Sequence, residues 1–159
     1  MRAALQEDAD AIALSSYQGG HLEYFKYMID MLRERGAGHI RVFGGGGGTI
    51  TPEEIAELQA YGVERIYHPN DGMKLGLVAM IEDVVARARA AAEKRTLPDT
   101  AALLDAASMT NEIALGGALS ALEQQRFDEA ALTAMRARWR DRGRKAVSIG
   151  VTGTGGAGK

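Results

Sequence analysis

The sequence contains no cysteine, which excludes a disulfide framework, a thiol nucleophile and a thiolate metal site. It also lacks a basic segment followed by an apolar signal core, and no apolar run approaches the length needed to cross a bilayer. The formal net charge of −2 gives no electrostatic reason to expect nucleic acid or an acidic membrane surface as a partner. These absences favour a reducing compartment, with the cytoplasm as the expected location and neither nucleic acid nor a membrane as a partner.

The composition is that of a soluble globular protein, with 46% hydrophobic and 25% charged residues among 159. This length suits one ordinary domain with part of a second. A run of five glycines, Gly44–Gly48, stands out. The residues His39–Phe43 before it predict a buried strand, and Thr51–Glu54 after it predict a helix start closed by a capping box. Open α/β sheets bind ligands where a strand ends and a helix begins, which favours a ligand-binding turn over a flexible linker.

Three successive units of strand, loop and helix are predicted before residue 96. The strands are expected at Ala9–Leu14, His39–Phe43 and Val63–Tyr67, and the helices at His21–Arg35, from Thr51 to Gly62, and after the loop His68–Gly72. Each unit spans about 25 to 30 residues, the size of a βαβ crossover. The sequence therefore predicts a parallel sheet with helices on both faces, a flavodoxin-like or Rossmann-like α/β fold. The residues expected to face inward from the last helix are Val78, Ile81, Val84, Val85 and Ala88.

The pattern changes after Arg95, where helical periodicity continues without strands. Residues 96–144 are therefore predicted to form a helical linker between a first domain, residues 1–95, and the start of another, residues 145–159. Met109 and Trp139 are expected to pack in a core or between domains rather than to bind a cofactor. The arginines between Arg136 and Arg144 are expected to form a solvated face, with docking onto an acidic neighbour as the alternative.

A phosphate-binding motif closes the sequence. The apolar residues Ala146–Val151 predict a strand, and the string Gly153-Thr154-Gly155-Gly156-Ala157-Gly158-Lys159 then matches G-x-x-x-x-G-K. Backbone N–H groups of such a loop cradle phosphates, and the lysine adds a positive charge. The alternative is a glycine-rich tail that contains a lysine by chance. The hydroxyl that holds Mg²⁺ and the catalytic residues would follow Lys159, so this segment alone is not expected to hydrolyse a nucleotide.

Small residues also follow the first two predicted strands. Ser15-Ser16-Tyr17 comes after one strand and Gly47-Gly48 after the next, and both loops are expected at the same edge of a parallel sheet. Small side chains at neighbouring strand ends leave a slot, and the hydroxyls beside it can bond a polar ligand. From these residues alone the ligand stays open, and a flavin phosphate is one candidate.

Three strings at these separations, SSYQGGH, VFGGGGGTITPEEI and VERIYHPNDG, resemble the cobalamin-binding domain of the acyl-CoA mutases. That family carries D-x-H-x-x-G, then S-x-L, then G-G at successive strand ends. Ser15-Ser16-Tyr17 corresponds to S-x-L with tyrosine in place of leucine, and Gly47-Gly48 corresponds to G-G. His68-Pro69-Asn70-Asp71 stands where G-P-G-T is usual. These departures, with the phosphate-binding loop, resemble the branch in which a cobalamin domain, a GTP-binding chaperone and a mutase barrel share one polypeptide.

The resemblance implies a site for the displaced nucleotide tail of adenosylcobalamin. The implied cofactor-binding residues are Ser15, Ser16, Tyr17, Gly19, Gly20, Gly44, Gly45, Gly46, Gly47, Gly48, His68 and Pro69. The histidine that ligates cobalt from below belongs to D-x-H-x-x-G, a string that does not occur here. None of His21, His39 and His68 is therefore assigned that role, no metal ligand is expected in this chain, and the sequence is expected to be an internal fragment that lacks the first strands of the domain.

For the parent protein the resemblance implies carbon-skeleton isomerisation of isobutyryl-CoA to n-butyryl-CoA, with GTP and Mg²⁺ bound by the chaperone module. The acyl-CoA would bind a barrel that is absent here, so no catalytic residue is expected in this chain, and the complete protein is expected to be a homodimer. Two alternatives stay open, a separate corrinoid-binding or delivery protein and a flavodoxin-like binding module unrelated to cobalamin.

Overall fold

The computed structural model describes residues 1–96, 99–107, 110–141, 147 and 149–150. Met1–Arg126 forms one compact unit, and a second unit begins at Phe127. The phosphate-binding loop Gly153–Lys159 lies outside the described residues, as do Met109 and half of the strand expected at Ala146–Val151. In the part of the chain that is described, no helix is long and apolar enough to cross a membrane.

A parallel three-stranded sheet forms the centre of the first unit. Its strands are β1 (Ala11–Ser15), β2 (Arg41–Gly45) and β3 (Arg65–Tyr67), in the order β1-β2-β3. This arrangement confirms the predicted α/β fold. Strand β2 ends two residues later than expected, because the pairing continues through Leu14 opposite Gly44 and Ser15 opposite Gly45. The first two glycines of the run are therefore strand residues rather than turn residues.

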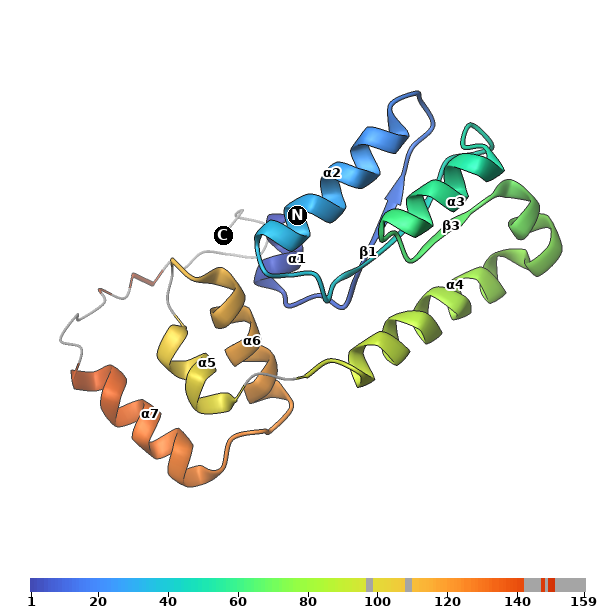
Figure 1. Cartoon of the computed structure of the whole chain (residues 1–159). Helices are drawn as coiled ribbons and strands as arrows, with labels where there is room; N and C mark the ends of the chain where they lie inside the picture. Colours follow the sequence, from blue (N-terminus) through green and yellow to red (C-terminus); the bar gives the residue numbers. More distant parts are fainter. Residues whose placement is uncertain (97–98, 108–109, 142–146, 148, 151–159) are drawn as a thin grey trace. The chain divides into compact units, whose positions relative to one another are not determined.

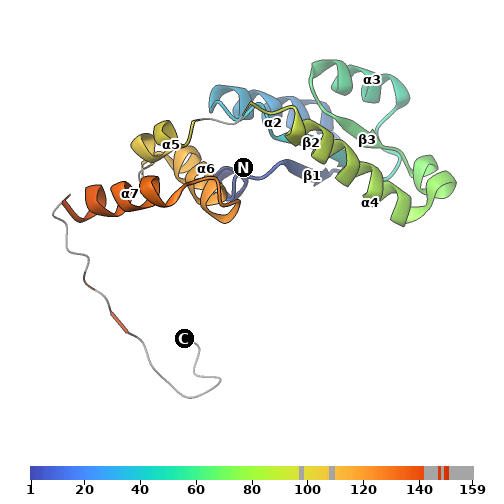
Figure 2. The same cartoon turned by 90° about the horizontal axis from the view of Figure 1, so that it is seen from below.

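Helices cover both faces of this sheet (Figures 1 and 2). Helices α2 (His21–Glu34) and α3 (Pro52–Tyr61) pack on one face, and α4 (Pro69–Glu93) lies on the other. The core under α2 is built by the apolar face that the sequence predicts, with Phe25, Ile29 and Leu32 each at most 6% exposed. It includes Val42 from β2 and Ile66 from β3, so alternate strand residues point to this side.

The start of α3 confirms the predicted capping box. Thr51 Oγ1 accepts a hydrogen bond from the Glu54 backbone N–H, and Glu54 Oε2 accepts one from the Thr51 N–H. A second capping box, which the residue pattern did not predict, opens α4. His68 Nδ1 accepts from the Asn70 N–H, while Asp71 Oδ2 accepts from the His68 N–H. The residues predicted as the loop His68–Gly72 are therefore the N-cap and first turn of α4.

The predicted inner face of α4 is partly wrong. Val78 is 70% exposed, Ile81 54% and Val85 41%, whereas Val84 and Ala88 are half-buried. Gly76 interrupts the helix with φ 77° and ψ 161°, which changes the direction of the side chains that follow. The side of α4 that contacts the sheet carries polar residues as well, because Asp83 bonds to β3.

Four further helices complete the described part of the chain. In the first unit, α1 (Arg2–Gln6) contacts α6 (Glu112–Glu123), and α5 (Thr100–Ala106) packs on α6. Arg2 pairs with Glu112, and a Cβ at Gly116 would lie 2.7 Å from the Gln6 carbonyl oxygen, so glycine permits this close approach. The first part of the predicted linker thus belongs to the same compact unit as the sheet. In the second unit, Trp139 on α7 (Glu129–Asp141) is 42% exposed.

Candidate functional site at the strand ends

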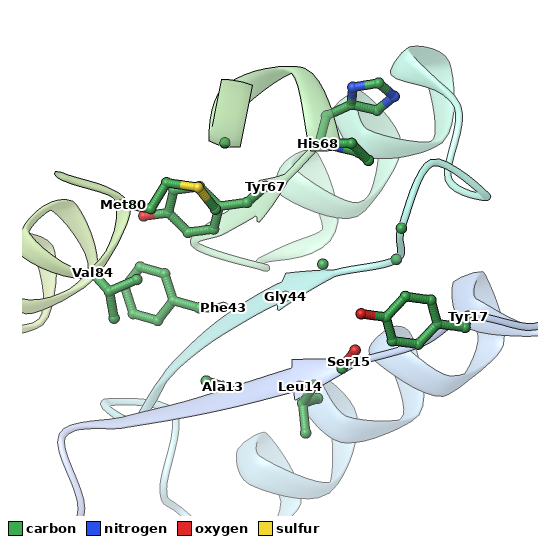
Figure 3. Close-up of a pocket in the computed structure, with 15 residues that line it drawn as sticks. Ala13, Leu14, Ser15, Tyr17, Phe43, Gly44, Tyr67, His68, Met80 and Val84 are labelled. Carbon is green, nitrogen blue, oxygen red and sulfur yellow. The ribbon is translucent and has the colours of Figure 1, made fainter. Parts of the chain in front are cut away.

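A cavity of about 410 Å³ lies at the carboxyl ends of the three strands (Figure 3). The β1 end contributes Ser15 and Tyr17, the β2 end contributes the glycines, and the start of α4 closes the opposite side. Such an edge is where open α/β sheets bind ligands. The lining residues are Ala13, Leu14, Ser15, Tyr17, Phe43, Gly44, Gly45, Gly46, Gly47, Tyr67, His68, Pro69, Gly72, Met80 and Val84.

Most of the residues predicted for the slot lie around this cavity. They are Ser15, Tyr17, Gly44, Gly45, Gly46, Gly47, His68 and Pro69. Four others lie elsewhere: Ser16, Gly19, Gly20 and Gly48 do not line it. Gly20 instead caps α2 with φ 87°, a left-handed conformation that favours glycine. The Ser16 N–H donates to the Gly45 carbonyl oxygen at 2.9 Å, which ties the β1 loop to the β2 end.

The consecutive glycines have different neighbours, although the sequence treats them alike. A Cβ at Gly44 would lie 2.4 Å from the Phe25 ring, so this glycine leaves space for the core on the α2 side. At Gly46 a Cβ would meet Ile50 at 2.5 Å and the Ser16 carbonyl oxygen at 2.7 Å. At Gly44 and Gly46 the absence of a side chain therefore leaves space for other residues of the protein. The prediction was that these glycines leave space for a ligand.

Gly45 is the glycine that leaves space on the cavity side. It pairs in register with Ser15 and with Tyr67, both of which line the cavity. A Cβ here would come no closer than 3.4 Å to any atom, the Tyr67 carbonyl oxygen. Gly44 and Gly45 are consecutive strand residues and face opposite sides of the sheet. Gly44 therefore leaves space for the core, and Gly45 leaves space for the cavity.

Two hydroxyl-bearing side chains from the β1 end reach into the cavity region. Figure 3 shows Ser15 and Tyr17 on the side facing the start of α4. Tyr17 is 71% exposed, and its ring covers Gly47, where a Cβ would lie 2.5 Å from the ring. Because Gly47 also has φ 58°, a side chain there would strain the backbone and displace Tyr17.

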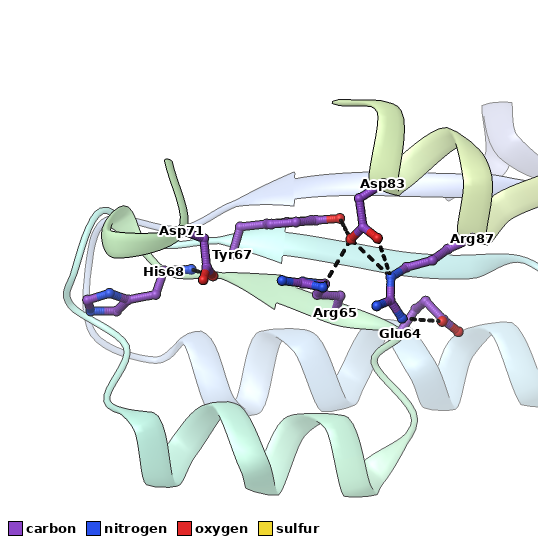
Figure 4. A network of polar contacts seen from close by, with 7 residues as sticks. All are labelled: Glu64, Arg65, Tyr67, His68, Asp71, Asp83 and Arg87. Atoms are coloured by element: carbon purple, nitrogen blue, oxygen red, sulfur yellow. Dashed lines mark hydrogen bonds and ion pairs between the residues drawn. The ribbon is translucent and has the colours of Figure 1, made fainter. Parts of the chain in front are cut away.

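A polar network fixes α4 against β3 beside the cavity (Figure 4). Tyr67 Oη donates to Asp83 Oδ2 at 2.7 Å, and Asp83 also pairs with Arg65 at 3.1 Å and with Arg87 at 3.0 Å. The hydrogen bond from Tyr67, followed by those from Arg87, lowers the pKa of Asp83. The Tyr67 ring is a cavity wall, so this network holds that wall in place.

The Tyr67 phenol is expected to ionise only in strong base. Burial and its hydrogen bond to Asp83 raise the pKa of Tyr67 to about 12. A raised pKa favours the protonated native state, so this contribution to stability is complete below the ordinary tyrosine pKa and is lost as pH rises toward about 12. Tyr61 also has a raised pKa, chiefly because it donates a hydrogen bond to Asp30. Ultraviolet titration of Tyr67→Phe should therefore lose only the step near pH 12, and a variant that instead loses amplitude in the ordinary tyrosine range contradicts the assignment.

The histidines contact groups of their own chain. His39 Nε2 lies 3.8 Å from Asp8 Oδ1, and burial followed by the charge of Arg95 lowers the pKa of His39. His68 caps α4 as described above, and His21 faces Glu54. Across the described residues, no three His, Cys, Asp or Glu side chains come together in a way that could hold a metal ion.

Sequence reasoning missed seven of the lining residues, most of them apolar: Ala13, Leu14, Phe43, Tyr67, Gly72, Met80 and Val84. Ala13, Phe43 and Tyr67 were not predicted, although each lies two strand positions from a predicted residue or opposite one. Since side chains alternate along a strand, the position of Ser15 already implies that Ala13 shares its face. Met80 and Val84 come from α4 and could be assigned only with the helix in place.

Comparison with known proteins relates the region that contains this cavity to a known domain family. Residues 1–78 match the family model of the B12 binding domain. The chain is 52% identical over 160 residues to a fused isobutyryl-CoA mutase of Cupriavidus metallidurans, and 42% identical over 174 residues to one of Geobacillus kaustophilus, matches that cover 99% and 100% of this chain. A fused isobutyryl-CoA mutase of Paraburkholderia xenovorans is 65% identical over 94 residues, 57% of this chain.

These relatives are much longer than the chain. The matched regions cover 14% of the Cupriavidus protein, 15% of the Geobacillus protein and 7% of the Paraburkholderia protein. The chain therefore spans about one seventh of the length of the first two, which it matches over nearly all of its own length. The matched family region, residues 1–78, includes all three strands and the lining residues as far as Gly72.

Proposed function

Because residues 1–78 of this chain belong to the B12-binding domain family, we propose that the cavity at the strand ends holds the nucleotide tail of a cobalamin. The observation that carries the proposal is the position of the cavity within that matched region. It lies at the sheet edge used by ligands in open α/β folds, and the loops of all three strands border it.

The lining suits a nucleotide tail, which joins a flat heterocycle to a ribose and a phosphate. A volume of about 410 Å³ falls in the range of small-molecule sites, about 300–1,000 Å³. Phe43, Met80 and Val84 offer apolar contact to the heterocycle, and the hydroxyls of Ser15 and Tyr17 offer hydrogen bonds to the polar part. An apolar pocket with a few polar groups is the usual composition of a cofactor site.

The predicted residues divide into two roles in this proposal. Ser15 and Tyr17 hydrogen-bond the tail, Gly45 leaves space for it, and His68 with Pro69 forms the opposite wall. Gly44, Gly46 and Gly47 line the cavity and leave room for Phe25, Ile50 and Tyr17. The loops are shaped outside the lining by Ser16, Gly19, Gly20 and Gly48. When bound, adenosylcobalamin supplies the radical for a carbon-skeleton isomerisation.

We further propose that this chain belongs to a longer acyl-CoA mutase that converts isobutyryl-CoA to n-butyryl-CoA. The names of the relatives support this proposal. The acyl-CoA, the cobalt-ligating histidine and the catalytic residues would belong to parts outside this chain. The proposed domains are a cobalamin-binding domain at 1–95, a helical linker at 96–144 and the start of a GTP-binding domain at 145–159, in a cytoplasmic homodimer.

Residues Gly153–Lys159 would bind the phosphates of GTP, with Mg²⁺ held by residues after them. The linker would then relay the nucleotide state to the cobalamin domain, which requires two linker arrangements of different nucleotide affinity. The contact between α1 and α6 supports a physical route, because it joins the first part of the linker to the unit that contains the sheet. Trp139 and Met135 are the proposed contacts at the far end of that route.

Replacing Ser15 by leucine in the full-length protein should weaken cobalamin binding about tenfold or more, because the larger side chain occupies the cavity. Visible spectroscopy during titration with adenosylcobalamin measures the affinity. Ala11→Leu is the matched control, since Ala11 lies on the same strand face and does not line the cavity. Equal binding by the wild-type protein and Ser15→Leu contradicts the assignment of the site.

The same preparation separates the alternatives. A mutase converts isobutyryl-CoA when adenosylcobalamin is present, a delivery protein binds the cofactor without converting it, and a flavodoxin-like module binds a flavin and no corrinoid. Conversion supports the proposed function, and either of the other outcomes overturns it.

A further inference from the structure

His21 is a buried ionisable residue next to the proposed site but outside its lining. It is the first residue of α2 and only 7% exposed. Burial of an imidazole is unfavourable unless its nitrogens find partners. The partners of His21 therefore indicate what the residue does.

Those partners belong to two different loops. His21 Nε2 lies 3.1 Å from Glu54 Oε2, and His21 Nδ1 lies 3.5 Å from the Gln18 carbonyl oxygen. Glu54 Oε2 also accepts a hydrogen bond from the Thr51 N–H at 2.8 Å. The hydrogen bond from the Thr51 backbone, and after it the neighbouring His21, lower the pKa of Glu54, which favours its carboxylate form.

The two loops are the ones that border the cavity. Gln18 follows Ser15 and Tyr17 in the β1–α2 loop, and Thr51 ends the loop that contains Gly46 and Gly47. The N-cap of α2 is Gly20, which makes no side-chain cap, so the β1–α2 loop has no such anchor at the helix start. His21 connects this loop to the capped start of α3.

We propose that His21 is a positioning residue for the nucleotide tail: through Glu54 and Gln18 it holds the Ser15–Tyr17 loop at a fixed place relative to the glycine loop. This inference rests on the proposed function. It assigns His21 no contact with the cofactor. A buried imidazole next to a carboxylate is costly to leave without that partner, so loss of the contact should be measurable in tail affinity.

A second pair joins the same two helices and serves as a control. Lys26 on α2 pairs with Glu57 on α3, about one turn further along each helix. Glu57 is 54% exposed, and neither residue lines the cavity. If the His21 pair acts only by fastening α2 to α3, removal of the Lys26 pair should act in the same direction.

The test compares two corrinoids in the full-length protein: cobalamin, which has the nucleotide tail, and cobinamide, which lacks it. His21→Leu should bind cobalamin about tenfold more weakly while cobinamide binding is unchanged. His21→Gln, whose amide can replace Nε2 as the donor to Glu54, should restore most of the affinity. Glu57→Gln should bind both corrinoids as the wild-type protein does.

Glu54→Ala removes the same contact from the partly exposed partner and serves if His21→Leu does not fold. Because it also removes the capping bond from the Thr51 N–H, it is compared with Thr51→Val, which removes the other half of the capping box and leaves His21 and Glu54 in place. The inference is overturned if His21→Leu and Glu54→Ala keep the wild-type ratio of cobalamin affinity to cobinamide affinity. It is also overturned if His21→Gln loses as much cobalamin affinity as His21→Leu, or if Glu57→Gln shifts the ratio as much as His21→Leu does. If the wild-type protein binds cobalamin no better than cobinamide, the proposed function fails and the inference fails with it.

Discussion

Gly44→Ala is expected to destabilise the sheet by about 1–3 kcal/mol, the usual effect of an extra methyl group in a filled core. The new Cβ would lie 2.4 Å from the Phe25 ring and 2.8 Å from Ile66 Cδ1. Phe25 is fully buried, so its ring has little room to move away. Replacing glycine by alanine also reduces the entropy of the unfolded chain, but this gain of about 0.4–1 kcal/mol is smaller.

Native-state hydrogen exchange of the β2 and α2 amides measures this loss as a lower free energy of opening. The double variant Gly44→Ala with Phe25→Leu supplies the control, because leucine lacks the ring atoms that the new methyl group would meet. Its opening free energy should exceed the value expected from adding the two single effects. Simple additivity of the two substitutions contradicts the steric explanation.

Gly45→Leu, one residue further on, is expected to leave the fold intact and to weaken cobalamin binding by about 10- to 100-fold. The position tolerates a Cβ, whose nearest atom would be 3.4 Å away. The added side chain points to the side of Ser15 and Tyr67, where the proposed nucleotide tail lies. The expected result is therefore a binding defect without a stability defect, opposite to that of Gly44→Ala.

Gly38→Leu is the matched control for this variant. A Cβ at Gly38 meets no atom within 4 Å, and the residue precedes β2, at the end of the strand away from the cavity. Cobalamin titration and hydrogen exchange should both leave this control at wild-type values. A Gly45→Leu protein that folds and binds cobalamin as tightly as the wild-type protein would show that the tail lies elsewhere.

The fold could be predicted largely from the sequence because its signals are local. Apolar periodicity located α2, and Thr51 with Glu54 marked the start of α3. The start of α4 was not predicted because its N-cap is His68. The ring nitrogen of this residue accepts the capping hydrogen bond that a serine, threonine or aspartate oxygen usually accepts. The inner face of α4 was only partly right because part of the side that contacts β3 is polar: Asp83 bonds to Tyr67 and pairs with Arg65, which apolar spacing does not report.

The sequence predicts an opening at the strand ends, where the structure has a cavity, but it does not distinguish the roles of the individual glycines there. Five adjacent glycines look equivalent in the sequence, and strand register is what assigns Gly44 to the core and Gly45 to the cavity. The wall formed by Tyr67 depends on Asp83, which lies on α4 and becomes its partner only after the chain folds back on β3. Local sequence patterns do not predict such contacts between distant segments.

Hydrogen exchange with and without cobalamin tests the central claim most directly, because it reports where the cofactor lies rather than how tightly it binds. In the full-length protein, cobalamin should slow exchange in the three loops that border the cavity, residues 15–20, 45–50 and 67–72. Cobinamide, which lacks the nucleotide tail, should protect these loops less. Saturating cobalamin that leaves all three loops exchanging as in the free protein would contradict the account.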